Sequence, residues 1–419
     1  MSDVPPFADL PVAADALHGR RAEALARYRA AGLPGPAIEA WKYTNLDGLK
    51  QLGLAPSGSV PSLQALPETV AALDGYRAVF VGGRFAPALS ALDGLPRGVT
   101  AESLAALMAR DPAAAAAALG ELGDAPLIAL NTAFAADGLV LRLARGAVLD
   151  QPLHLVSVGA PGLAFHPRHV IALAEDAVAS VVESHVGSGG YFANQVAELR
   201  VGTGASLRHA VLQRQADAAF HVAAVRLDLA ARASYEGFVL QIGAHLARHE
   251  FNARLAGDGA DCRLAGLVLA AGDRHVDNTT FIDHAGPGGR SRQLFKTVLD
   301  DTSRGVFQGR VLVRPDAQKT DAHQLSRALL LSRKAEMDGK PELEIYADDV
   351  RCSHGATIGS LEQEPMFYLM SRGIDRATAY RMLVEAFAVE ALDEIGAAAV
   401  REAFAVPVAA WLATRGGVS

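Results

Sequence analysis

A short stretch in the last third of the chain concentrates side chains suited to metal or sulfur chemistry. Two carboxylates, a thiol and an imidazole fall within seven positions, at Asp348, Asp349, Cys352 and His354. This mixture suits iron, zinc or a persulfide carrier. In a β-strand, residues i and i+2 point to one side, so Cys352 and His354 are predicted to share a face. The alternative is structural, with Cys352 as a small buried hydrophobe and His354 as a hydrogen-bonded polar residue.

The cysteine count limits what this stretch can hold by itself. The only thiols, Cys262 and Cys352, are 90 positions apart, which gives neither a disulfide framework nor a Cys-x-x-Cys ligand pair. A typical iron–sulfur cluster needs about four thiolates, so any cluster here requires ligands from another chain. Cys262 lies inside a strand repeat, and we interpret it as a core residue.

Other candidate sites are weaker. His166 with His169, and His245 with His249, have ligand-like spacing but no third ligand, so we interpret them as ordinary strand-face or turn histidines. The nearest approach to a phosphate-binding loop, at residues 286–291, lacks the lysine and the spacing. Nucleophile-elbow and zinc-protease motifs are also missing from the sequence. We therefore expect neither ATP hydrolysis nor any other enzymatic activity from this chain.

Composition narrows the partners and the location. The 419 residues include 39 Lys and Arg against 46 Asp and Glu, a formal net charge of -7, which argues against nucleic acid. The first residues do not resemble a signal peptide, and no apolar run reaches the roughly 18 residues of a membrane span. The sequence predicts a cytoplasmic protein without a membrane partner.

The candidate ligands follow a long repetitive region that must position them. From about Leu139 to Val313, short alternating runs are punctuated by Gly and Asp, with no convincing helix. Comparable strands open at Ala177, Ala205, Ala233 and Ala260, and the preceding strands are predicted to end at Leu173, Leu199, Leu227 and Leu255. Stacked coils would bury such a repeat, as in a β-helix or a β-sandwich. We favour the β-helix because the period is regular.

Helical patterns flank the repeat. Helices are predicted over residues 14–31 and 102–119, with a strand at 78–81 between them. After Gly359 a helix with Asp375 as N-cap is expected. Its apolar face comprises Tyr380, Leu383, Val384, Phe387, Ala391 and Ile395. This face either packs on the chain's own core or docks a partner. The predicted domains are an N-terminal helical and mixed domain (1–125), a β-helix core (126–358) and a C-terminal helical domain (359–419).

Several motifs resemble those of one family. Residues 343–359, LEIYADDVRCSHGATIG, resemble a signature of the SufB/SufD iron–sulfur cluster assembly scaffolds, and FYL at 367–369 and SRGI at 371–374 continue it. Upstream, four further segments resemble that family in the expected order: EAWKYT at 39–44, FVGGRF at 80–85, LNTAF at 130–134 and SRGVFQG at 303–309. The resemblance therefore spans nearly the whole chain.

The resemblance implies a right-handed parallel β-helix between helical domains, in a complex with two partners. A SufB-like paralogue would associate through the β-helix, and a SufC-like ATPase would bind the C-terminal helices. For the ATPase contact the expected residues are Arg372, Gly373, Ile374, Tyr380, Leu383 and Phe387. Cys352 and His354 would share a nascent cluster or iron with the paralogue. No cofactor is expected to stay bound to this chain alone.

Departures from the family pattern favour the SufD branch. Where SufB has a functional cysteine in a Gln-Cys-Asp context, this chain has Gln324-Leu325-Ser326, so the sulfur-accepting thiol is expected on SufB. Two questions stay open: whether Cys352 and His354 are ligands or the chain is purely structural, and whether it forms a homodimer in isolation. A carbohydrate-active enzyme, the remaining alternative, rests on fold analogy and would need an aromatic groove, whereas aromatics are only 6% of the chain.

Overall fold

The computed structural model describes residues 5–58, 61–68, 70, 72–120 and 125–415. The α-helices are α1 (His18–Ala31), α2 (Leu104–Arg110), α3 (Pro112–Ala118), α4 (Pro126–Phe134), α5 (Gln363–Ser371), α6 (Arg376–Leu392) and α7 (Ala398–Ala413). The strands before the regular repeat are β1 (Ala55–Pro56), β2 (Tyr76–Val81), β3 (Arg84–Phe85), β4 (Val99–Ser103), β5 (Leu139–Leu143), β6 (Leu153–Gly159) and β7 (Leu163–Phe165). The repeat comprises β8 (Arg168–Leu173), β9 (Val178–Gly187), β10 (Phe192–Val201), β11 (Ser206–Gln213), β12 (Phe220–Leu229), β13 (Ser234–Gln241), β14 (Leu246–Leu255), β15 (Asp261–Ala270), β16 (His275–His284), β17 (Arg290–Leu299), β18 (Arg304–Val313), β19 (Asp321–Leu330), β20 (Glu336–Ile345) and β21 (Arg351–Gly359).

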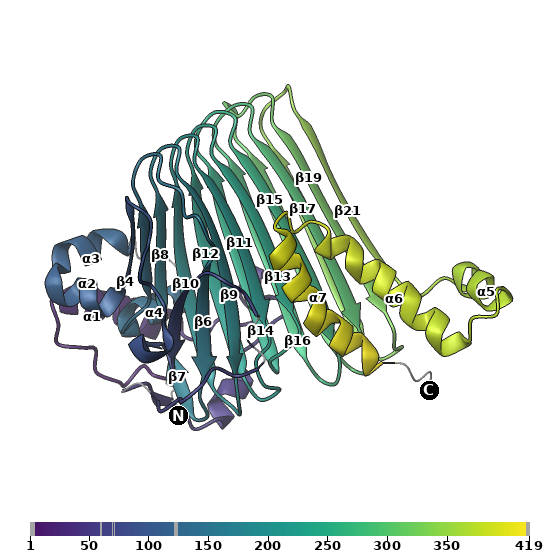
Figure 1. Ribbon diagram of the computed structural model, residues 1–419, viewed down its shortest axis with the longest axis horizontal. Coiled ribbons are helices and arrows are strands. Elements are labelled where there is room, and N and C mark those ends of the chain that lie inside the picture. Colours follow the sequence, from purple (N-terminus) through teal and green to yellow (C-terminus); the bar gives the residue numbers. More distant parts are fainter. Residues whose placement is uncertain (1–4, 59–60, 69, 71, 121–124, 416–419) are drawn as a thin grey trace.

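The strands form two facing parallel sheets that wind as a β-helix, as predicted (Figure 1). Even-numbered strands from β8 to β20 stack in one sheet, which we call sheet A, and odd-numbered strands from β9 to β21 stack in the other, sheet B. Each strand therefore pairs with the strand one coil away, rather than with its neighbour in sequence. Strand structure continues beyond Val313 to Gly359, so the coil stack is longer than the alternating pattern alone indicated.

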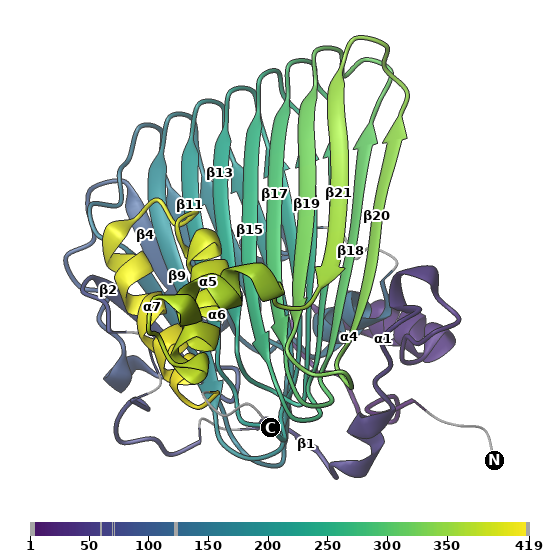
Figure 2. The same cartoon turned by 90° about the vertical axis from the view of Figure 1, so that its right-hand side faces the viewer.

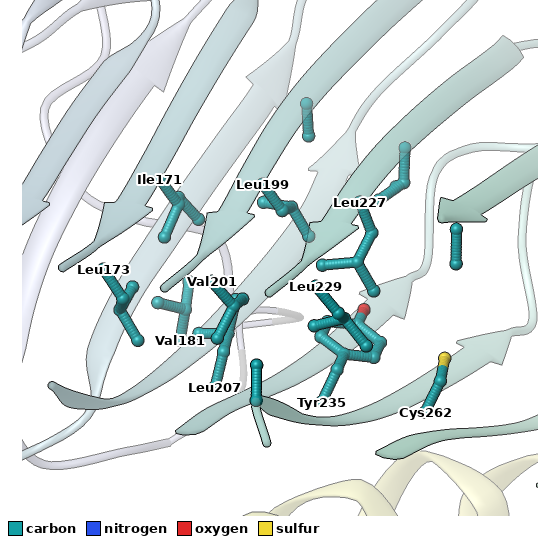
Figure 3. Close-up of a cluster of buried hydrophobic side chains, with 14 of the residues drawn as sticks. Ile171, Leu173, Val181, Leu199, Val201, Leu207, Leu227, Leu229, Tyr235 and Cys262 are labelled. Carbon is teal, nitrogen blue, oxygen red and sulfur yellow. The ribbon is translucent and has the colours of Figure 1, made fainter. Parts of the chain in front are cut away.

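Rows of apolar side chains fill the space between the sheets. Because successive strand residues point to opposite faces, each interior position is repeated at the same height in every coil. Figure 3 shows two such rows, Ile171–Leu199–Leu227 and Leu173–Val201–Leu229. The predicted alignment of Leu199 and Leu227 with Leu173 and Leu255 is therefore wrong. The residues that end β10 and β12 are Val201 and Leu229, two positions later. Leucine, valine or isoleucine occupies both of these interior rows, so the two rows look alike in the sequence.

The turns between coils explain the alanine period. Ala177, Ala205, Ala233 and Ala260 are fully buried immediately before β9, β11, β13 and β15, as predicted. Each follows a residue with positive φ: Asp176 (58°), Gly204 (67°), Arg232 (54°) and Gly259 (66°). A left-handed residue reverses the chain tightly, and the small alanine side chain then fits at the corner.

Short antiparallel strands and helices close the N-terminal end of the stack. β3 pairs antiparallel with β2, and β4 pairs antiparallel with β5. The single helix predicted over residues 102–119 is divided into α2 and α3, because Asp111 caps α3 and Pro112 begins it. α1 packs against α4, with Tyr28 and Leu130 fully buried between them.

The EAWKYT segment ties this N-terminal part to later coils. The Trp41 ring lies 4.0 Å from the Arg248 guanidinium, which is fully buried and paired with Asp277 and Glu250. Thr44 donates a hydrogen bond to Asp277. The motif therefore fixes the N-terminal segment against β14 and β16.

The C-terminal helices α6 and α7 cover part of the outer face of sheet B (Figure 2). Asp375 is the N-cap of α6, as predicted, and accepts a hydrogen bond from the Thr378 amide. Lys296 of β17 is fully buried beneath the helix, where its ammonium group donates to the Phe387 carbonyl over 3.0 Å. No described helix is long and apolar enough to cross a membrane.

Candidate functional site

Cys352 and His354 lie in β21, at the last coil of the described β-helix. β21 is the terminal strand of sheet B and pairs with β19, in a register that aligns Ala322 with Cys352 and Gln324 with His354. Ala322 and Gln324 are both buried in the interior. Both candidate ligands therefore occupy the interior face of β21, as the spacing predicted, but no described coil covers them.

The two side chains differ in exposure. Cys352 is half-buried and packs against the interior core, whereas His354 is exposed. Partial burial raises the pKa of the Cys352 thiol, and this effect exceeds that of a hydrogen bond with the Ala322 backbone, which lowers it. The thiol is therefore protonated at neutral pH, and ligation would require its deprotonation. His354 is the more accessible of the two candidate ligands.

The two aspartates of the motif do not join this pair. The Asp349 carboxylate forms an ion pair with Lys319, and the Asp349 backbone amide donates a hydrogen bond to the Gln318 side chain. In the described part of the chain, no group of three or more His, Cys, Asp and Glu side chains is arranged to hold a metal ion. Asp348 and Asp349 precede β21, and only Cys352 and His354 of the four residues share a face of that strand, as predicted.

The end of the coil stack exposes backbone and apolar side chains together. β20 terminates sheet A as β21 terminates sheet B, so both strands have an edge without a described neighbour (Figure 2). Ile345 is 40% exposed, Tyr346 64% and Ile358 48%. An uncovered strand edge flanked by apolar side chains is a surface that can accept another strand. We call this surface, formed by β20 and β21, the open end.

The structure divides the predicted ATPase-contact residues into two groups. Tyr380 and Phe387 pack against the apolar cluster between α6 and sheet B, so this face of α6 covers the chain's own core. Leu383 is half-buried, whereas Arg372, Gly373 and Ile374 form the turn between α5 and α6.

Exposed aromatic side chains lie on α5 beside that turn. Phe367 is 74% exposed and Tyr368 58%, and the Arg372 guanidinium lies 5.1 Å from the Tyr368 ring. We call this surface, formed by Phe367, Tyr368 and Arg372, the α5 patch. Its two aromatic side chains are more exposed than Met382 (43%) and Val389 (40%), the exposed large apolar side chains of α6.

A buried polar cluster inside the β-helix was missed by the sequence analysis. The Glu183 carboxylate accepts hydrogen bonds from His185 (2.8 Å), His209 (2.9 Å) and Gln195 (2.7 Å). Burial by itself raises the pKa of Glu183, but the bonds from His185 and His209 hold that pKa well below its usual range. The signal was available at His209, because Leu207 and Val211 on either side fix its position as interior.

The remaining candidates have structural environments. Cys262 is buried in the interior core, where burial strongly raises the pKa of its thiol. His166, His169 and His249 are buried as well, and burial lowers the pKa of His169 and His249 to about 4. His245 lies in the turn before β14. None of these histidines forms a metal-binding group among the described residues.

Comparison with known proteins places these features in one family. Residues 156–387 match a family model described as "SUF system FeS cluster assembly, SufBD core domain", and residues 11–155 match the SufBD protein N-terminal region. The chain is 33% identical to the iron–sulfur cluster assembly protein SufD of Escherichia coli over 378 residues, covering 86% of this chain and 84% of that protein. A SufBD family protein of Synechocystis is 33% identical over 386 residues, covering 88% of this chain and 85% of that protein.

Proposed function

Because this chain belongs to the SufBD family of iron–sulfur cluster assembly proteins, we propose that it is a non-catalytic scaffold subunit. It pairs with a SufB-like paralogue through the open end and binds a SufC-like ATPase through the C-terminal helices. His354, with Cys352, supplies this chain's share of the ligands for a nascent cluster or iron. The cluster is cargo that passes through the complex, and its remaining ligands come from the paralogue.

One observation carries this proposal: the two candidate ligands occupy the interior face of the one coil end that is uncovered in the described structure. A second β-helix placed against β20 and β21 would continue both sheets by strand addition. This association would also enclose Cys352 and His354 between the two chains. Since a typical cluster needs about four protein ligands, two residues here are half of a set that the partner completes.

The α5 patch supports the second contact. Large aromatic side chains together with an arginine are typical anchor residues of protein interfaces. Phe367 is largely exposed in this chain, and an exposed aromatic of this size gains free energy when a partner buries it. We therefore assign the ATPase contact to Phe367, Tyr368 and the Arg372–Ile374 turn. Tyr380 and Phe387 then act indirectly, by holding α6 on sheet B.

Substituting His354 tests the ligand role. His354→Ala removes an exposed side chain without a described hydrogen-bond partner, so the fold and the assembly of the complex should be unchanged. Cluster formation by the reconstituted three-component complex should be abolished, because the cluster loses a ligand at the interface. Co-purification measures assembly, and absorption spectroscopy measures the cluster.

The rival function is purely structural, with the chain only shaping the complex and recruiting the ATPase. In that case a complex carrying both Cys352→Ala and His354→Ala forms clusters as the wild type does, and the ligand role is rejected. Ser353→Ala is the matched control, since Ser353 lies between the two on the opposite face of β21 and contacts His323.

The ATPase contact is tested by Phe367→Ser. This exposed change should leave the unfolding free energy within about 0.5 kcal/mol of the wild type, as surface substitutions usually do. The ATPase subunit should be lost from the purified complex, while the SufB-like subunit is retained. Val406→Ser on α7 is the control, because Val406 is also 67% exposed but lies away from the α5–α6 turn. Retention of the ATPase by the Phe367 variant contradicts the assignment.

A further inference from the structure

Gln324 lies directly behind His354 in the last pair of coils. It belongs to β19, is 2% exposed, and is the register partner of His354 in β21. Parallel strands are about 4.8 Å apart, so the two side chains point in the same direction on adjacent strands. Neither the oxygen nor the nitrogen of the Gln324 amide has a hydrogen-bond partner among the described residues.

A buried amide without partners is unusual and costs free energy, because it has lost its hydrogen bonds to water. A purely structural position of this kind would be filled better by a leucine of similar size. His354 likewise has no hydrogen bond to any described residue. Two unpartnered polar groups thus lie side by side, one fixed in the core and one free to rotate at the surface.

The space for the Gln324 amide depends on Gly309 of β18, in the opposite sheet. A Cβ atom added at residue 309 would lie 2.0 Å from the Gln324 amide nitrogen and 2.6 Å from its carbonyl carbon. Gly309 has no positive φ that would demand glycine for backbone reasons. The glycine therefore serves to admit this amide.

Gln324 also belongs to a row of polar side chains that runs along the stack of coils. The row on sheet B runs through Gln293 and Gln324 to His354, one residue per coil. The Gln293 carbonyl accepts a hydrogen bond from Thr280 over 2.7 Å, while its amide nitrogen has no described partner. Stacked glutamines on neighbouring parallel strands can bond in a ladder, and rotation of each amide by about 180° reverses its direction.

We propose that Gln324 is the positioning residue for His354. Its carbonyl oxygen accepts a hydrogen bond from the inward ring nitrogen of His354, so the outward nitrogen keeps its lone pair and faces the paralogue. A histidine that binds a metal generally donates its other ring N–H in this way, which fixes the tautomer and the ring orientation. The inference rests on the ligand role of His354 proposed above, and it adds the group that prepares that ligand.

The test uses Gln324→Leu in the full chain. Labelled-histidine NMR, with the His354 signal assigned from the His354→Ala spectrum, measures the ring tautomer. The wild type should favour the tautomer with the proton on the inward nitrogen, and Gln324→Leu should lose this preference. In the complex, the apparent affinity for Fe²⁺ should fall on the order of 10- to 100-fold, as expected when an outer partner of a ligating histidine is removed.

Stability separates positioning from a structural role. Leucine replaces an unpartnered amide in an apolar interior, so the variant should be as resistant to urea as the wild type or more so. Gly309→Ala is the second variant: its methyl group displaces the amide from the opposite sheet, and it should reproduce the tautomer change without altering β21. Ser326→Ala, which changes the next interior position of β19, is the matched control and should leave the His354 signal unchanged.

Each outcome decides between the two proposals. An unchanged His354 tautomer in both Gln324→Leu and Gly309→Ala overturns the positioning role. A changed tautomer supports the contact, even if clusters still form with His354→Ala. That last result would overturn the ligand role alone, so the failure of one proposal is distinguishable from the failure of the other.

Discussion

The two ends of the β-helix differ in the hydrogen bonding of their interior polar side chains. Near the N-terminal end, the buried Glu183 carboxylate is fully engaged, because it accepts three hydrogen bonds from side chains in its own and the neighbouring coils. At the open end, the Gln324 amide and His354 have no described partners. Buried polar groups are stable only when they are paired, so the first arrangement is a finished core. The second arrangement is one that a partner can finish.

The backbone at the two ends shows the same contrast. Antiparallel strands β3 and β4 terminate the sheets at the N-terminal end, where α1 to α4 also pack. β20 and β21 are full-length coil strands, and each has one edge that no described strand pairs with. Strand edges of this kind are usually shielded in monomeric proteins. The difference supports the proposed association with a partner at the C-terminal end of the stack.

The largest effect that tests this contrast is expected from Glu183→Ala. Removing the carboxylate leaves His185 and His209 buried without their acceptor, and breaking a buried charged network costs about 3–5 kcal/mol. Urea denaturation should show this loss, and hydrogen exchange should place it in β9 to β13, since stability in a coil stack is local.

The matched change at the open end is His354→Ala, which should alter the unfolding free energy by less than about 0.5 kcal/mol. Glu183→Gln, which keeps one acceptor, should be intermediate. Equal losses from Glu183→Ala and His354→Ala would remove the distinction between a finished and an unfinished end.

Each buried histidine is expected to make a smaller contribution, which depends on pH. Burial lowers the pKa of His154, His169 and His249 to about 4, with a further lowering of the His154 pKa by Arg77 and of the His249 pKa by His209. Unfolded histidine titrates near pH 6.5, so between about pH 6.5 and 4 the unfolded chain binds protons that the folded chain does not. The contribution of these histidines to the free energy of unfolding is therefore fully present above pH 6.5. It is lost as pH falls below 6.5, by about 1.4 kcal/mol per pH unit for each histidine.

Denaturation midpoints measured from pH 7 to pH 5 test this slope. His249→Gln should reduce it by about 1.4 kcal/mol per pH unit, because one buried titrating group is gone. Gln324→Leu, which changes no titrating group, should leave the slope unaltered. An unfolding free energy that does not change from pH 7 to pH 5 would show that these histidines are hydrated, and that the interior around them is not dry.

Much of the fold could be predicted because its determinants are local. The 27- or 28-residue spacing of Ala177, Ala205, Ala233 and Ala260 follows from one tight turn per coil, and each turn is encoded by adjacent residues. The face shared by Cys352 and His354 follows from strand alternation. The alignment of Leu199 and Leu227 failed, because similar apolar residues occupy two interior rows and spacing alone does not choose between them.

The candidate site was predicted less completely, because it depends on contacts between distant segments. The apolar face of α6 could pack on the chain or on a partner, and only the position of sheet B beneath Tyr380 and Phe387 decides this. Asp348 and Asp349 are close to Cys352 in sequence, but the turn directs them elsewhere. The exposure of Phe367 was not predicted either, and only the packed structure shows that α5 leaves this side chain uncovered.

By itself, the sequence determined the coil repeat, the turn positions and the common face of Cys352 and His354, since each depends on residues within one strand or turn. The tertiary structure decided that no coil of the described residues covers β21, that Gln324 lies behind His354 from 30 positions away, and that Glu183 binds one histidine of its own strand and one of the next coil. The physical reason is register. Alternation fixes which way a side chain points, but only the stacking of one coil on the next fixes what it meets.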